Sequence, residues 1–118
     1  MLMKIDQIRS LTKEFTHIFS LNIEYSEIEL RYNLKLTLCK DLFDIKQHFL
    51  IVNFIGVTNL NLSDFDSQFN QILGLVIEDN INSWERIKYD VHQIEDDGLF
   101  FRCFDINAEL TSSHNNSI

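Results

Sequence analysis

The chain contains 118 residues and carries a formal net charge of −8, with 10 Lys and Arg against 18 Asp and Glu. This length suits one domain, and an apolar share of 45% with ten Phe excludes a wholly disordered chain. The negative charge argues against a nucleic-acid or anionic-membrane partner, since basic patches bind both. No apolar run approaches the roughly 20 residues of a membrane-spanning helix, so we expect no membrane segment.

The first twenty residues have the pattern of an amphipathic helix. Apolar side chains recur every three or four residues, at Ile5, Ile8, Leu11, Phe15 and Ile18/Phe19. Polar residues fill the positions between them, which predicts one apolar stripe along a helix over about residues 4–20. A helix of this length is only marginally stable alone in water, so the stripe is expected to pack on another element.

From Glu27 the apolar period changes to two. Apolar and polar residues alternate from Glu27 to Leu38, which predicts a strand with one buried and one solvent-facing side. The apolar residues stay at even positions through Tyr32-Asn33, so we expect either one long strand or an odd-length, bulged break there. Residues 49–57 are apolar at both parities, apart from Asn53 and Gly56, which is typical of a strand in the middle of a sheet.

Two later segments are expected to complete the sheet. Residues 71–78 are rich in strand-forming residues, and residues 87–106 have the pattern of a hairpin with Asp97-Gly98 as its two-residue turn. This turn places Val91 opposite Phe104, and the apolar cross-strand pairs select that register.

The expected fold is therefore α+β, with the N-terminal amphipathic helix packed on a mostly antiparallel sheet of five or six strands. One domain covers residues 1–110, with the helix at about 4–20 and the sheet at about 27–110, and residues 111–118 form a disordered tail. The chain contains no Pro. Charged side chains must then protect its edge strands, or a partner must pair with them.

Residue types that commonly carry chemistry form no recognisable motif. The four His and two Cys show no metal-ligand spacing, and three isolated Gly form no phosphate-binding loop, so no metal or cofactor is expected. The hairpin register places His92 opposite Cys103, where an imidazolium would lower the thiol pKa. A mid-strand position without an oxyanion donor favours simple packing of Cys103, so no enzyme activity is expected. Without an export signal, Cys39 and Cys103 are expected to be reduced in the cytoplasm.

Acidic clusters are the main functional indication. They surround Glu24, Glu27 and Glu29, the pair Glu78 and Asp79, and two expected turns. A small acidic domain without a reaction centre suits a basic protein partner, because complementary charge speeds encounter and selects the partner. The candidate contacts are Asp64, Asp66, Glu95, Asp96 and Asp97, with Trp84 as an apolar anchor.

The order of these segments resembles the small immunity proteins of bacterial polymorphic toxin systems, including contact-dependent inhibition systems. The amphipathic helix, an F-x-G-V-x-x-L segment at residues 54–60 and the terminal hairpin carry the resemblance over about residues 5–110. It implies a cytoplasmic inhibitor that binds one toxin, expected to be a basic domain. Two alternatives stay open: a homo-oligomeric structural or adaptor protein that uses an exposed sheet edge, and a small-ligand binder.

Overall fold

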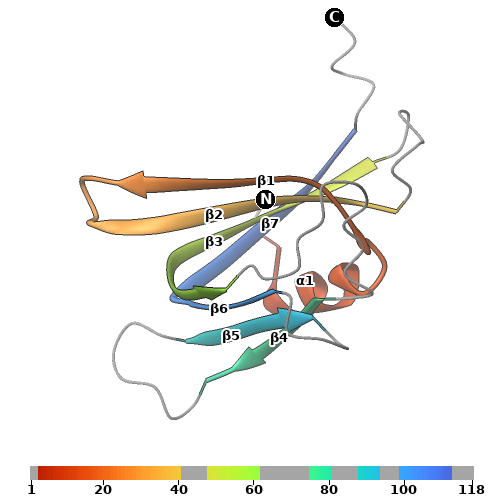
Figure 1. Cartoon of the computed structure of the whole chain (residues 1–118). Coiled ribbons are helices and arrows are strands. Elements are labelled where there is room, and N and C mark those ends of the chain that lie inside the picture. Colours follow the sequence, from red (N-terminus) through yellow and green to blue (C-terminus); the bar gives the residue numbers. More distant parts are fainter. Residues whose placement is uncertain (1–2, 41–47, 62–74, 81–87, 94–98, 113–118) are drawn as a thin grey trace, which may run out of the picture.

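The computed structural model shows a sheet-rich fold with one short helix (Figure 1) and describes residues 3–40, 48–61, 75–80, 88–93 and 99–112. Its elements are α1 (Ile5–Thr12), β1 (His17–Ser26), β2 (Arg31–Cys39), β3 (His48–Asn61), β4 (Leu75–Asp79), β5 (Tyr89–Gln93), β6 (Phe100–Cys103) and β7 (Asp105–Ser112). The expected helix and antiparallel sheet are present, but the described sheet has seven strands where five or six were expected.

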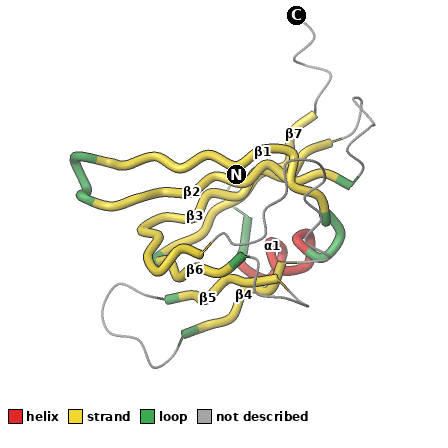
Figure 2. The backbone as a smooth tube through the Cα atoms, viewed as in Figure 1, coloured by secondary structure: helices red, strands yellow, loops and turns green. Residues whose placement is uncertain are grey.

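The strands form one bent sheet in the order β1-β2-β3-β6-β5-β4, and β7 also pairs with β3. β3 is central, as its apolar sequence predicted, and it changes its partner along its length. Its first part pairs with β7, from His48 opposite Ser112 to Ile55 opposite Asp105, and its last part pairs with β6. Figure 2 shows β1 and β2 on one side of β3 and β6, β5 and β4 on the other.

The bend lies at Gly56 of β3 and at Phe104, between β6 and β7. Gly56 has a φ of +68° and is the extra residue of a bulge opposite β2. The Phe104 N–H donates to the carbonyl of Ile55 at 2.8 Å, so both strands turn at the same level. The Asn33 Oδ1 atom accepts the N–H of Gly56 at 3.1 Å, which satisfies the donor that the bulge removes from the ladder.

The two halves of the bent sheet enclose one apolar core. Phe54 from β3 and Phe101 from β6 meet edge-to-face, with ring centroids 4.8 Å apart. Leu34, Leu36 and Leu38 of β2 point into the same core, and we call this face of the sheet the inner face. Fully burying each such side chain contributes about 1.5–3 kcal/mol relative to exposure, which makes this core the main stabilising feature of the fold.

The helix is shorter than the expected residues 4–20, and that prediction is wrong beyond Thr12. Residues 17–26 form β1, which pairs with β2 along its whole length. Phe15 and Ile18 are buried as the stripe predicted, but they lie after the helix and in β1. The same segment also alternates at period two, through Phe19, Leu21, Ile23 and Tyr25. β-branched and aromatic residues favour a strand, and pairing with β2 decides the competition.

The short helix is held against the sheet by polar contacts as well as by the buried Ile8. The Arg9 Nε atom donates to the carbonyl of Ile77 in β4 at 3.0 Å, and its Nη2 atom lies 2.8 Å from a carboxylate oxygen of Asp79. α1 also contacts β7. The expected packing of the helix on the sheet is therefore confirmed, at the β4 edge.

The expected register of the terminal hairpin is wrong. Val91 of β5 lies opposite Phe101 of β6 instead of Phe104. The chain bends at Phe104, so residues 105–112 pair with β3 and do not continue along β5. Apolar cross-strand pairs alone cannot reveal such a bend, because both arrangements place apolar residues opposite one another. The Asp97-Gly98 turn lies outside the described residues, and β7 reaches Ser112, beyond the expected end of the sheet at 110.

Replacing Gly56 by Ala should lower the free energy of unfolding by about 1–3 kcal/mol, measured by urea denaturation. The new Cβ would lie 3.1 Å from the Cβ of Phe104 in a backbone conformation that disfavours side chains. Asn59→Ala is the control. Asn59 also has a positive φ, of 54°, but it already carries a Cβ, so this substitution adds no new atom beside a neighbour. Equal losses in the two variants would show that the contact with Phe104 has no effect.

Candidate functional site

The β1–β2 hairpin turn occupies residues 27–30, where the sequence predicted the start of a strand. Tyr25 of β1 lies opposite Tyr32 of β2, with ring centroids 4.9 Å apart. The Ser26 hydroxyl accepts the N–H of Glu29 at 3.2 Å, and Leu30 ends the turn with a φ of 56°. The strand prediction is therefore wrong at this end.

The missed signal was a change of parity along the sequence. Apolar residues occupy odd positions from Phe19 to Tyr25 and even positions from Ile28 to Leu38. A shift by one residue marks a hairpin or a bulge, because the side chains of a strand alternate strictly between the two faces.

Six large apolar side chains are exposed around this turn. Ile28 is 95% exposed and Leu30 is 72% exposed, although the alternation predicted both to be buried. We call the whole surface the hairpin patch, and it consists of Ile23, Tyr25, Ile28, Leu30, Tyr32 and Leu60. Exposed apolar side chains that gather in one region of a surface often mark an interaction site.

Two adjoining hollows shape the hairpin patch. The larger, of about 530 Å³, is lined by Ile23, Tyr32, Val57, Thr58, Asn59 and Leu60. The smaller, of about 230 Å³, shares Tyr32, Val57 and Thr58 with it and extends to Tyr25, Leu30, Arg31, Gly56 and Phe104. The shared residues make the two hollows one continuous surface beside the bend of β3. Apolar hollows beside exposed aromatic rings are suited to receive apolar side chains of another molecule.

The hairpin patch is uncovered because β1 and β2 extend beyond the opposing half of the sheet (Figure 1). On β2, Leu34 is fully buried, whereas Tyr32, the next residue toward the turn on the same face, is 52% exposed. The inner face of the sheet thus continues past the core into an exposed apolar surface.

The rim of the hairpin patch is acidic. Glu24 and Glu27 are exposed and form no ion pair within the described part of the chain. The nearby Arg31 is already neutralised, since its Nη2 atom lies 2.9 Å from a Glu29 carboxylate oxygen. Its guanidinium also stacks 5.5 Å from the centroid of the Phe104 ring, which holds it against the protein surface. The rim of the hairpin patch therefore carries net negative charge.

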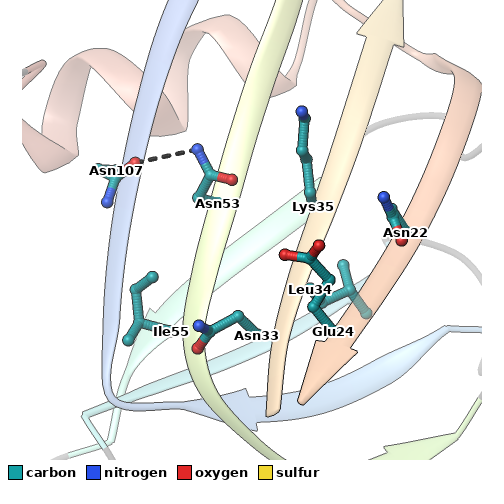
Figure 3. A pocket seen from close by; sticks show the side chains of 8 residues that line it. All are labelled: Asn22, Glu24, Asn33, Leu34, Lys35, Asn53, Ile55 and Asn107. Atoms are coloured by element: carbon teal, nitrogen blue, oxygen red, sulfur yellow. Dashed lines mark hydrogen bonds between the residues drawn. The ribbon is translucent and has the colours of Figure 1, made fainter. Parts of the chain in front are cut away.

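The opposite, outer face of the sheet carries a polar pocket of about 270 Å³ (Figure 3). Asparagines from four strands line it, at positions 22, 33, 53 and 107, together with Glu24, Leu34, Lys35 and Ile55. The Asn53 Nδ2 atom donates to Asn107 Oδ1 at 3.1 Å, and Asn33 accepts from the bulge. Three of the four amides thus already have hydrogen-bond partners on neighbouring strands, and these bonds help to stabilise the sheet.

The structure tests none of the expected contact residues. Asp64, Asp66, Trp84, Glu95, Asp96 and Asp97 all lie outside the described residues. Of the acidic clusters that the sequence indicated, Glu24, Glu27 and Glu29 lie beside the hairpin patch, whereas Glu78 and Asp79 are at the β4 edge.

Cys103 and His92 do not face each other. Cys103 lies opposite Tyr89, and the His92 Nε2 atom is 3.2 Å from a carboxylate oxygen of Glu78. The expected juxtaposition is wrong because it depended on the incorrect hairpin register. Burial, with smaller contributions from Asp105 and Asp90, raises the pKa of the Cys103 thiol to about 12. Cys103 is therefore a protonated thiol at neutral pH, and both it and Cys39 are buried cysteines that form no disulfide within the described residues.

Within the described ranges, no three His, Cys, Asp or Glu side chains are grouped so as to hold a metal ion. No helix in these ranges has the length and apolar character needed to cross a membrane. In comparisons with known proteins, no family model, curated protein or solved structure matches this chain.

Raising the pH should destabilise the protein through Cys103. An acid whose pKa is raised by folding stabilises the fold below its unfolded pKa of 9.0 and loses that contribution as the pH rises toward 12. From about pH 8 to about pH 10 we expect the free energy of unfolding to fall by about 1.4 kcal/mol more than in Cys103→Ala. Urea denaturation at each pH measures this difference, and parallel pH profiles of the two proteins would contradict it.

Proposed function

We propose that this chain is a non-enzymatic protein-binding module whose partner docks on the hairpin patch. The exposure of six large apolar side chains at one end of the sheet carries this proposal. Tyr25 and Tyr32 add rigid aromatic surface, which is enriched where protein partners gain most of their binding energy.

The partner is expected to be basic around an apolar anchor. Glu24 and Glu27 at the rim form no ion pair with any described residue, and the whole chain carries a net charge of −8. Such charges mainly accelerate encounter and select the partner, while the apolar hollows supply the affinity.

The resemblance of the sequence to immunity proteins supports a bacterial toxin domain as this partner. In this role the chain acts in the cytoplasm and neutralises the toxin by covering or distorting its functional surface. The chemistry of the described residues supports binding over catalysis, because Cys103 is a buried, protonated thiol. The pocket amides of Asn33, Asn53 and Asn107 are engaged in holding the sheet.

Calorimetry with the toxin domain encoded immediately upstream tests the proposal. We expect tight binding, and protection of cells that express this toxin domain together with the chain. Ile28→Ser should weaken binding at least tenfold, which corresponds to about 1.4 kcal/mol, because it removes an apolar contact. It should change stability by less than about 0.5 kcal/mol, because Ile28 is 95% exposed.

Leu110→Ser is the matched control for this measurement. Leu110 is an exposed apolar residue of β7 that lies outside the hairpin patch, so its replacement should leave binding unchanged. Added salt should slow association of the native protein, because it screens the acidic rim. Absence of both binding and protection would exclude the toxin as partner, and equal losses in the two variants would exclude the hairpin patch as the binding surface.

Leu30 should show a trade-off between stability and binding. It is a bulky residue at a φ of 56°, where Gly is ordinarily preferred, and its exposed side chain packs little against the protein. Leu30→Gly should therefore raise the free energy of unfolding by about 0.5–1 kcal/mol while weakening partner binding. Thermal denaturation and calorimetry measure the two effects, and unchanged binding would show that the partner does not touch Leu30.

A further inference from the structure

Among the described strands, β1 lies at the edge of the sheet and has β2 as its only neighbour (Figure 1). It is ten residues long, contains no Pro, Lys or Arg, and carries one carboxylate, that of Glu24. The other described edge strands are shorter and more acidic: β4 has five residues, including Glu78 and Asp79, and β7 has eight, including Asp105 and Glu109. An edge as long and as weakly charged as β1 favours pairing with another strand.

The regular part of β1 has a symmetric pattern of side chains. A register shift separates Ile18 from Ser20, and the turn follows Ser26, so the uninterrupted ladder spans residues 20–26 with Ile23 at its centre. Read outward from Ile23, the flanking pairs are Asn22 with Glu24, Leu21 with Tyr25, and Ser20 with Ser26. Polar residues thus match polar residues, and apolar residues match apolar residues, about this centre.

We propose that two copies of this chain pair through their β1 strands in an antiparallel, two-fold symmetric arrangement centred on Ile23. Each Leu21 then lies opposite the second copy's Tyr25 on the inner face, and Ile23 lies opposite itself. On the outer face each Glu24 carboxylate lies opposite the amide of the second copy's Asn22, which can donate a hydrogen bond to it. No two like charges are directly opposed in this register.

Neighbouring registers fit less well. A register centred on Glu24 places two carboxylates directly opposite each other, which is destabilising. A register centred on Asn22 extends the ladder to Phe19, which lies at the irregularity and stacks on Phe49 with ring centroids 4.8 Å apart. The Ile23 register also covers part of the exposed surface of Ile23 and Tyr25, which are 39% and 49% exposed.

This inference goes beyond the proposed function and has the opposite dependence on salt. Two copies that each carry a charge of −8 repel each other, so added salt should strengthen the dimer by screening that repulsion. A complex with a basic partner should weaken under the same change. Failure of one proposal is therefore distinguishable from failure of the other.

Cysteine cross-linking tests the register directly. The native Cys39 and Cys103 are fully buried, so an introduced thiol on β1 is the accessible one. Under mild oxidation Ile23→Cys should form a covalent dimer rapidly, because its two copies are opposed. Leu21→Cys and Tyr25→Cys should each cross-link poorly alone, and a mixture of these two variants should form the heterodimer.

Sedimentation equilibrium measures the dimer itself. The native chain should shift from monomer to dimer as concentration rises, and Ile23→Lys should weaken this association at least tenfold by opposing two ammonium groups. Leu110→Lys, on β7, is the matched control and should leave it unchanged. A native chain that stays monomeric at every concentration, even at high salt, would overturn the proposal. So would cross-linking that is fastest at position 21 or 25, or equal dimerisation of the two Lys variants.

Discussion

The fold depends on β3 pairing with two different strands, β7 and β6, along the same edge. The first part of β3 pairs with β7 and its last part pairs with β6. The change of partner occurs where Gly56 bends β3 and Phe104 bends the segment between β6 and β7, at the same level of the sheet. This bend brings one half of the sheet over the other, so that the rings of Phe54 and Phe101 meet. Without it the apolar inner face of the described seven-stranded sheet would need a separate covering layer, and α1, the one helix among the described residues, is too small to supply it.

The same bend explains why the protein has an exposed apolar end. The strands that fold over the core are short, with four residues in β6 and five in each of β4 and β5, whereas β1 and β2 have ten and nine. The short strands cover the inner face as far as Leu34, and the remaining length of the hairpin stands free. Core and hairpin patch are therefore parts of one continuous surface, divided only by how far the opposing half of the sheet reaches.

The hairpin offers two kinds of contact that differ physically. The hairpin patch presents side chains, with apolar hollows and, at its rim, the carboxylates of Glu24 and Glu27, which pair with no described residue. The β1 edge presents backbone groups, whose pairing depends on little more than a compatible register and the absence of opposed charges. A short turn with Leu30 in a left-handed conformation joins the two strands that carry these surfaces, so local backbone strain lies beside both of them.

Local pattern identified the helix and several strands of this protein, whereas tertiary structure decided that β1 is a strand, where the other elements end and what they pair with. Alternation in residues 31–38 and apolarity at both parities in residues 49–57 identified β2 and a central β3, because both signals follow from the two-residue period of a strand. Residues 17–20 fit both a helix and a strand by sequence, and only pairing with β2 resolved the ambiguity. The bend at Phe104, the register of β5 and the exposure of Ile28 in the turn were likewise decided in three dimensions, since each depends on which strands pair and where that pairing stops. Periodicity reports which side chains share a face, but it does not report which stretch of that face another part of the chain will cover.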